Sequence, residues 1–465
     1  MTEGTTSTTT DKPFGARFLT PLLLGSTLNP INSSMLATGL VGIGVDFHKG
    51  PGATSALVSV LYLCSAVAQP TMGKLATIFG PRRVFVSGIV ILLVAGVVGA
   101  AAPAFWMLLV SRALIGIGTS AAYPTAMALV RRRADERGVG VPSRVLGNFS
   151  IAAQITSVVG LPLGGVLAGA FGWRALFLVN VPVALVTLAF TFAGVAKDGP
   201  LESGGHEGRR RTLRALDLPG IVAFAGAIVT LLLFLGDLGD PTWWLLAVAA
   251  VLGVLLVLRE LRASSPLVDV RMLASNGPLV RTYLRQLFVG LGMYTCMYGV
   301  SQWMEEAAGL TASQVGLVLI PLSGVSIVVA RVVSVRGVVR VPLVLTGVAV
   351  LAASALTLAL DSGSSVWLMI AATCAIGLAN GLGGFANQAT LYANAAADQI
   401  AVASGLYRTA MYLGAIFSSS LIAVTFGDEA TDAGLHELGW VLAGIGAALV
   451  VLTTTDRRIP RTTVR

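Results

Sequence analysis

The chain has 465 residues, of which 55% are hydrophobic and only 11% are charged. A soluble domain carries about 25% charged residues, so the composition excludes a soluble globular protein, and the abundance of apolar residues excludes a disordered one. Long unbroken apolar runs such as 84–102 indicate membrane-spanning helices rather than a β-barrel, whose strands alternate apolar and polar residues.

Fourteen apolar runs follow one another along the chain. Most are close to the roughly 20 residues that a helix needs to cross a bilayer, so they predict an all-α polytopic membrane protein with 14 transmembrane helices. The run 243–258 is the shortest and the weakest of them. The runs are 19–45, 53–72, 84–102, 105–129, 145–170, 175–196, 218–236, 243–258, 283–303, 314–330, 341–360, 366–388, 401–425 and 438–454.

The basic residues sort to one side of this topology. With a cytoplasmic N-terminus, 28 of the 31 Lys and Arg residues fall in cytoplasmic segments, Lys49 and Arg174 fall outside, and Arg112 lies within a run. Because basic residues accumulate in cytoplasmic loops, both termini are predicted to face the cytoplasm. The net charge of +9 then reflects topology, and we expect no nucleic-acid partner.

The tryptophans give a second test of the topology. All seven lie at predicted outer ends of runs, as expected for a belt of aromatic residues at the headgroup level. They are Trp106, Trp173, Trp243, Trp244, Trp303, Trp367 and Trp440.

Enzymatic chemistry has no visible basis in the sequence. The three cysteines lie inside apolar runs without disulfide or metal-ligand spacing, and there is no phosphate-binding loop or nucleophile arrangement. We expect no enzyme activity, metal or cofactor. The polar segment 197–217 is interpreted as a cytoplasmic linker between six spans and eight, with no soluble domain.

Several motifs lie at the ends of runs or inside them. The loop after the second run contains Gly73 and Gly80 with Arg82 and Arg83, in the string GKLATIFGPRR. Run four contains the string RALIGIG, which starts at Arg112, and run five contains GLPLGG at 160–165. The strings WRALFLVNVP at 173–182 and ASGLYR at 403–408 complete the set.

Together these strings resemble the major facilitator superfamily, in its branch of fourteen-span drug/proton antiporters. A weak internal repeat agrees with it, since Arg336 and Arg340 flank Gly337 much as basic residues follow Gly80. The resemblance implies two six-helix bundles with the substrate at the midplane between them. The implied division is tail 1–18, bundle 19–196, linker 197–217, extra pair 218–258, bundle 259–454 and tail 455–465.

The loop motif has two interpretations. Gly73 and Gly80 permit a tight turn, and Arg82 and Arg83 can anchor it to anionic headgroups. The resemblance instead implies a gate latch whose arginines pair with carboxylates and helix ends. The family's loop Asp is absent, because Thr77 stands in its place.

The run-five motif permits close packing and bending of helices, through Gly160, Pro162, Gly164 and Gly165. The resemblance adds a role in sealing the cytoplasmic side. The two roles are compatible.

Arg112 lies within run four, about eight residues from its outer end. A charge at the centre of a membrane helix costs about 2.5–3.5 kcal/mol on insertion scales, so it needs a partner or a water-filled cavity. It is either a structural arginine bonded to carbonyl groups or, as the resemblance implies, a participant in proton relay.

The proton-carrying carboxylate is missing from its usual place. The branch commonly has an Asp in the first span, and here Asn29 stands at that position. The remaining carboxylates near outer ends are Asp46, Asp237, Glu305 and Glu306, each of which is otherwise a solvated loop charge. Glu305 and Glu306 directly follow run nine and are the best-placed candidates.

The candidate substrate-binding residues are amides, methionines and tyrosines within runs. Methionine and aromatic residues suit a pliable pocket for varied apolar ligands, and ordinary bundle packing is the alternative, commoner explanation for any one of them. Polar amides at membrane depth should face the interior or a cavity. The candidates are Asn29, Asn32, Gln69, Met293, Tyr294, Met297, Tyr298, Asn380, Asn387 and Gln388.

The sequence therefore predicts a monomeric multi-pass transporter of the cell membrane, surrounded by lipids, that exports a hydrophobic or amphipathic small molecule in exchange for protons. Two alternatives stay open. One is a facilitator or importer without proton coupling, which the absence of the first-span Asp favours. The other is a membrane sensor that binds its ligand without moving it.

Overall fold

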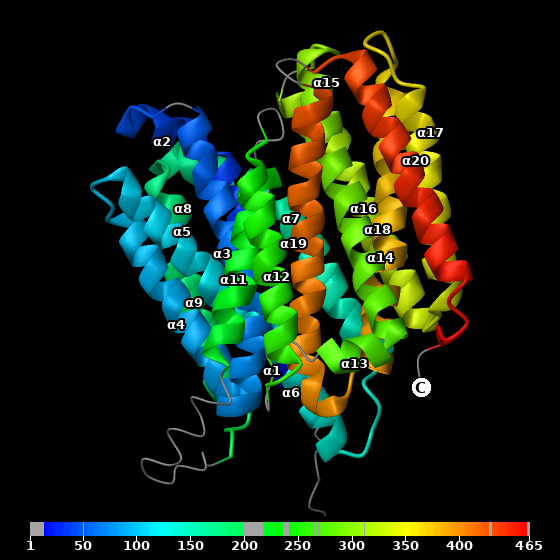
Figure 1. Cartoon of the computed structure of the whole chain (residues 1–465). Coiled ribbons are helices and arrows are strands. Elements are labelled where there is room, and N and C mark those ends of the chain that lie inside the picture. The colour runs from blue at the N-terminus through cyan, green and yellow to red at the C-terminus, as the bar shows by residue number, and fades with distance from the viewer. Residues whose placement is uncertain are drawn as a thin grey trace, which may run out of the picture.

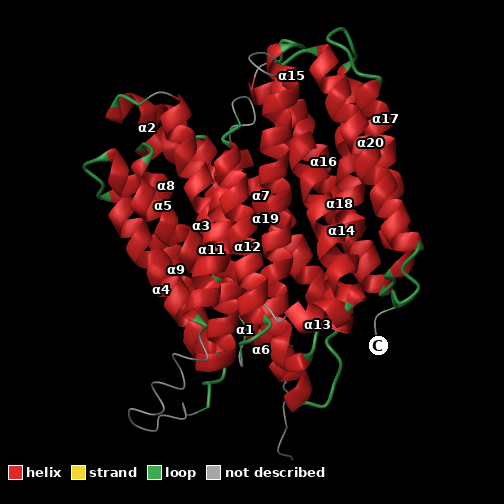
Figure 2. Ribbon diagram, viewed as in Figure 1, coloured by secondary structure: helices red, strands yellow, loops and turns green. Residues whose placement is uncertain are grey.

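The computed structural model describes residues 14–49, 51–199, 217–235, 241–263, 266, 270–310, 312–426 and 430–462. These residues form an all-helical protein (Figure 2). The β-contact among them is an isolated bridge between Val338 and Thr462. The predicted all-α class is therefore confirmed.

The first half of the chain folds into one bundle (Figure 1). Its helices pack on one another, with α1 against α7 and α9, and α4 against α5 and α9. At Gly80 the backbone adopts φ +93°, which favours glycine, and Pro81 then opens the next helix. The helices are α1 (Ala16–Ala37), α2 (Leu40–Phe47), α3 (Pro51–Phe79), α4 (Pro81–Ala100), α5 (Phe105–Ser120), α6 (Ala122–Glu136), α7 (Ser143–Phe171), α8 (Arg174–Leu178) and α9 (Asn180–Gly194).

The second half forms a matching bundle, in which α17 packs on α18 and α20, and α14 on α19. Gly337 repeats the positive φ of Gly80, at +61°, in agreement with the internal repeat. The elements are α13 (Val270–Ser275), α14 (Gly277–Tyr294), the π-helix η1 (Thr295–Val300), α15 (Ser301–Glu306), α16 (Ala312–Arg336), α17 (Arg340–Leu358), α18 (Val366–Asn394), the 3-10 turn η2 (Ala397–Gln399), α19 (Ile400–Phe426) and α20 (Asp432–Thr454).

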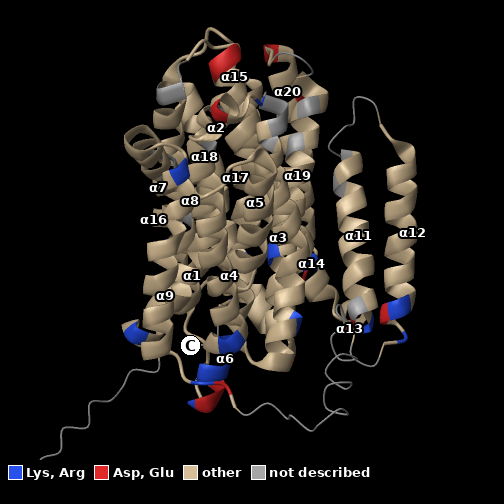
Figure 3. Cartoon of the chain, turned by 90° about the vertical axis from the view of Figure 1, so that its left-hand side faces the viewer, with Lys and Arg blue, Asp and Glu red and all other residues tan. Residues whose placement is uncertain are grey.

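Two further helices, α11 (Leu218–Leu235) and α12 (Trp243–Glu260), stand beside the bundles (Figure 3). They pack on each other, and α11 also contacts α3 and α19. Only 11% of the apolar stretch of α12 is buried, as expected for a helix that faces lipid. The predicted linker lies largely outside the described residues, at 200–216.

Charges gather at the two ends of the helices, and the middle is almost free of them (Figure 3). Ten of the described helices are long and apolar enough to cross a membrane. The other predicted runs, 19–45, 145–170, 218–236 and 283–303, also fall on helices, but the count of fourteen stays a prediction. In α1 and α14, interior polar residues such as Asn29 and Arg285 lower the hydropathy.

The two bundles meet toward one end of the molecule, which holds the 73–83 loop and the C-terminal segment. We call it the inner end, after its predicted orientation. The described contacts between the bundles, mainly α3 with α19 and α7 with α16, run from mid-depth to this end. At Gly73 an added Cβ would lie 2.5 Å from the carbonyl oxygen of Ala401, which shows how closely α3 and α19 approach. Toward the opposite end, which carries α2 and α15, the ribbons diverge (Figure 1).

Two of the seven tryptophans differ from the expected aromatic belt. Trp173 and Trp303 are buried, and their indole nitrogens donate hydrogen bonds to Asp46 (2.7 Å) and Asp432 (2.8 Å). Buried indoles need such a polar partner. The others are exposed on the bundle surface: Trp106, Trp243, Trp244, Trp367 and Trp440.

Candidate functional site

Asn29 lies at mid-depth, where the two bundles meet. Its Nδ2 donates to Ser65 Oγ and Thr119 Oγ1, each at 2.9 Å, and its Oδ1 accepts a hydrogen bond from the Tyr412 hydroxyl at 3.0 Å. The amide thus connects α1 to α3 and α5 within its own bundle and to α19 in the other. A carboxylate could accept from Tyr412 but could not donate to the two hydroxyls.

Four tyrosines from both bundles gather beside this amide. The rings of Tyr62 and Tyr412 lie 5.8 Å apart across the junction. Tyr294 and Tyr298 stack at 5.8 Å, and both lie within hydrogen-bonding reach of Tyr62. Tyr298 belongs to the π-helix η1, and Tyr294 immediately precedes it; such single π-turns occur often at functional sites. We call these four residues the tyrosine cluster.

The sequence pointed to half of this cluster. Tyr294 and Tyr298 were candidates because they share a helical face in the Met- and aromatic-rich run nine, whereas Tyr62 and Tyr412 lie in two distant runs. Of the methionine candidates, Met293 is buried and Met297 is partly exposed.

The position of Arg408 differs from the one that the topology predicted. The topology placed it in a cytoplasmic segment, but it lies inside α19, about two turns from the helix start. Its guanidinium carbon lies 4.0 Å from the centroid of the Tyr123 ring on α6, in the facing bundle. The side chain is partly exposed at the junction, and its Nε has no hydrogen-bond partner.

Arg112 is fully enclosed in the first bundle, with 1% of its surface exposed. Its Nε donates to the carbonyl of Leu57 at 3.0 Å, and Nη1 donates to the carbonyl of Asn32 at 3.4 Å. Carbonyl groups of α1 and α3 therefore replace a carboxylate as its partners. This is the environment of a structural arginine that ties three helices together.

The five predicted amides other than Asn29 occupy different surroundings. Asn32 donates to Asn180 at 2.7 Å inside the first bundle, away from the junction. Gln69 is buried on α3, and its Oε1 has no partner. Asn380 is buried on α18 with a free Nδ2, Asn387 accepts from Arg285 at 3.2 Å, and Gln388 contacts Met127 of the facing bundle.

The three described carboxylate candidates lie near the outer end. Asp46 accepts from Trp173 and pairs with Arg174 at 3.3 Å. Glu306 accepts from Gln302 at 3.0 Å and from the main-chain amide of Ala430 at 2.8 Å. Both are therefore engaged in holding loops, and Glu305 is exposed. Asp237 lies outside the described residues.

The carboxylate that contacts the loop motif comes from a distant part of the chain. Asp198, which follows α9, accepts from the main-chain amide of Arg83 at 2.8 Å and from Arg132 of α6 at 2.7 Å. Its side chain is 3% exposed, although its partner Arg132 is partly exposed. Arg82 instead stacks on Phe192, 5.2 Å from the ring centroid. Asp198 thus caps α4 and supplies the acceptor that Thr77 cannot, a role that local sequence did not reveal.

A hollow of about 850 Å³ opens between this motif and the second bundle. Its wall includes Lys74, Arg131 and Arg132 on one side and Asp398 and Tyr283 on the other. Lys74 crosses toward the second half of the chain and donates to the carbonyl of Pro266 at 2.8 Å. The inner end is therefore bridged by polar contacts as well as by close helix packing.

The run-five motif brings α7 against α1. An added Cβ would lie 2.5 Å from Ser34 Cβ at Gly160 and 2.7 Å from the Met35 carbonyl oxygen at Gly164. Gly165 has open space instead, and the side chain of Pro162 lies outside the described ones. The contact packs two helices of the same bundle, as the close-packing interpretation requires.

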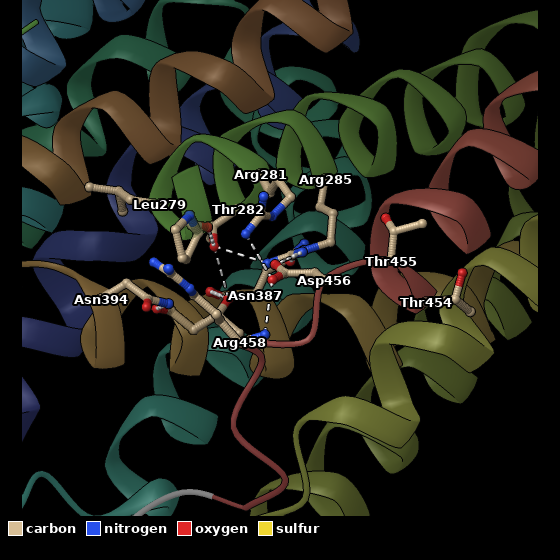
Figure 4. Close-up of polar contacts among 12 residues, drawn as sticks. Leu279, Arg281, Thr282, Arg285, Asn387, Asn394, Thr454, Thr455, Asp456 and Arg458 are labelled. Carbon is tan, nitrogen blue, oxygen red and sulfur yellow. Dashed lines mark hydrogen bonds and ion pairs between the residues drawn. The ribbon is translucent and has the colours of Figure 1, made fainter. Parts of the chain in front are cut away.

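An ionic cluster joins the C-terminal segment to the inner end of the second bundle (Figure 4). Asp456 accepts from Arg281 at 2.9 Å and from Arg285 at 3.2 Å, and Arg285 also donates to Asn387 and Thr282. Burial by itself would raise the pKa of Asp456, but the hydrogen bonds from the two arginines outweigh it and hold the pKa below its usual value. The predicted tail thus begins as a docked segment.

Comparison with known proteins agrees with this architecture. Residues 22–419 match the Major Facilitator Superfamily. The chain is 32% identical to the uncharacterised MFS-type transporter YwoD of Bacillus subtilis over 96% of this chain and 98% of that one. It is 26% identical to the tetracenomycin C resistance and export protein of Streptomyces glaucescens, over 90% and 79% of the two chains.

Among solved structures, the human organic anion transporter MFSD10 aligns with a TM-score of 0.65 and 15% identity, over 94% of this chain and 99% of that one. At that identity the likeness concerns the fold alone. The family match and the relative in Bacillus cover nearly the whole chain. The chain therefore belongs to the Major Facilitator Superfamily of multi-pass membrane transporters.

Proposed function

We propose that the protein exports a hydrophobic or amphipathic small molecule in exchange for protons, by alternating access. The observation that carries the proposal is the distribution of contacts between the bundles. They run from the mid-depth junction of Asn29 and Tyr412 to the inner end, where Gly73 approaches Ala401. This arrangement corresponds to a transporter closed inside, with the tyrosine cluster at the depth where the family binds substrate.

Two relatives support export as the direction. One is described as a tetracenomycin C resistance and export protein, and another, in Bacillus subtilis, as the multidrug transporter MdtP. The tyrosine cluster fits such substrates, since stacked phenol rings offer apolar faces together with hydroxyl groups.

A facilitator without proton coupling is the second candidate function. It is favoured by the placement of the described carboxylates, each of which lies in a loop or within about two turns of a helix end. If proton exchange operates, its carrier in the described residues is one of Asp46, Glu305 and Glu306, with Arg112 as a positioning group. A carboxylate introduced by Asn29→Asp should then be tolerated or strengthen coupling.

Transport by purified protein in proteoliposomes separates these functions. With an imposed proton gradient, an exporter accumulates substrate against its concentration, whereas a facilitator only equilibrates it. The double substitution Glu305→Gln and Glu306→Gln should remove the pH dependence of transport. Binding without movement under either condition would leave the sensor as the remaining function.

A further inference from the structure

Arg408 differs from Arg112 and Arg285, which also lie inside the bundles, because its guanidinium contacts a side chain of the facing bundle. Arg112 is enclosed in one bundle and bonded to two carbonyl oxygens, although its Nη2 has no partner, and Arg285 is bonded to Asp456, Asn387 and Thr282. Among the described residues Arg408 makes no ion pair, and its Nε has no acceptor. Yet a charge at membrane depth requires a partner.

The surroundings of Arg408 consist of phenol groups. It lies over the Tyr123 ring and within hydrogen-bonding reach of that hydroxyl. Tyr294, Tyr407 and Tyr412 also lie within its electrostatic reach. A cation–π contact at a partly desolvated site contributes about 0.5–2 kcal/mol, but the Nε donor of Arg408 is left without an acceptor.

Arg408 also lies at the base of the tyrosine cluster. It is one helical turn closer to the inner end than Tyr412, on the same helix. One turn further inward, Ser404 is fully buried and its hydroxyl has no partner. Residues four apart share a helix face, so this face of α19 presents the Ser404 hydroxyl and the Arg408 Nε, neither of which has a partner.

We propose that Arg408 binds the anionic group of the substrate, and that the transporter's substrates are amphipathic organic anions with an aromatic or apolar body. A carboxylate or sulfonate would accept two parallel hydrogen bonds from the guanidinium fork. The rings of the tyrosine cluster would contact the apolar body, one turn further out. The inference rests on the proposed function only in placing the substrate at this junction.

The test uses three planar probes of nearly equal size that differ in charge: 2-naphthoate, 2-naphthamide and 2-naphthamidine. Their binding to the purified full-length protein is measured by calorimetry. We expect wild type to bind the carboxylate roughly tenfold to a hundredfold more tightly than the amide, the range for a charged hydrogen-bonded contact. Arg408→Gln should abolish that preference, and Arg408→Glu should reverse it toward the amidine.

Arg331→Gln is the matched control, since it removes the same charge from an exposed position on α16. It should leave the preference intact. Equal binding of carboxylate and amide by wild type, or a preference that survives Arg408→Gln, would overturn the proposal. If neither Gln nor Glu variant folds, Arg408→Lys decides. It keeps the charge but loses the fork, so it must weaken the preference while Arg331→Lys does not.

Transport of the same probes is followed in proteoliposomes with and without a proton gradient. Equal gradient-driven transport of all three probes would contradict the anion proposal and support the proposed export function. Selective binding of the anion with no transport under any condition would support the anion site and contradict the proposed export function.

Discussion

Asp456→Asn tests how much the ionic cluster between the C-terminal segment and the second bundle contributes to the free energy of unfolding. The substitution keeps the shape of the side chain but removes the charge that faces Arg281 and Arg285. Both Asp456 and Arg285 have side chains that are 1% exposed, so the arginine would be left buried without a counter-charge. Removing one partner of a buried ion pair costs about 3–5 kcal/mol.

The structure favours the lower part of that range. Arg285 would keep its hydrogen bonds to Asn387 at 3.2 Å and Thr282 at 3.0 Å, and Arg281 is one-third exposed, at 33%. We therefore expect a loss of about 3 kcal/mol in the free energy of unfolding. Asp135→Asn is the control, because its pair with Arg131 is exposed, at 54% and 31%, and such pairs contribute only about 0–1 kcal/mol.

The assay is thermal unfolding of the purified protein, followed with a thiol-reactive dye that reports exposure of its three free cysteines, of which Cys296 is buried and Cys64 and Cys374 are partly buried. The midpoint for Asp456→Asn should fall several times further than that for Asp135→Asn. Equal midpoints for the two variants would show that the cluster does not hold the C-terminal segment, and the reasoning would fail.

Acidification provides an independent check of the same pair. Since the folded pKa of Asp456 is below the unfolded value of about 3.9, its stabilising contribution is fully present above that pH. It is lost as the pH falls through the folded value. The difference between wild type and Asp456→Asn should thus be constant from about pH 5 to 8 and shrink below about pH 4. A difference that changes between pH 5 and 8 would contradict the assignment.

Three further predictions address the junction and the packing around it. Arg112→Gln should lower the unfolding midpoint, because two carbonyl groups each lose a hydrogen bond from a charged donor, which contributes about 1.5–3 kcal/mol. If gradient-driven transport is lost while the midpoint is unchanged, the result would instead support a role in proton relay. Tyr412→Phe removes the 3.0 Å bond to Asn29 and should shift the equilibrium away from the inner-closed state by about 0.5–1.5 kcal/mol. The shift would be seen as faster labelling of a cysteine introduced at the inner end. Gly73→Val should prevent α3 from packing against Ala401, because even a Cβ at this position would lie 2.5 Å from the Ala401 carbonyl oxygen. It should therefore increase the same labelling, and unchanged labelling would refute the contact.

The sequence by itself determined the class of the protein and the distribution of its helices. The apolar runs identify membrane helices because a bilayer imposes a minimum length of apolar chain, which is a local property. The turn at Gly80 and Pro81, its repeat at Gly337, and the close packing at Gly160 and Gly164 also follow from local residue type. Asn29 was singled out because it occupies the position where the resemblance places an ionisable residue, and its role in transport stays a prediction.

The tertiary structure decided which side chains meet. Asp198 and Arg83 are 115 residues apart, and Tyr412 and Asn29 are 383 apart, so no spacing rule could pair them. Arg408 was counted with the cytoplasmic charges although it lies within the run 401–425. Only the packing of α19 against α6 shows that its guanidinium faces Tyr123 at the junction of the bundles. The chemistry of this transporter therefore depends on contacts between helices that the chain brings together from opposite halves.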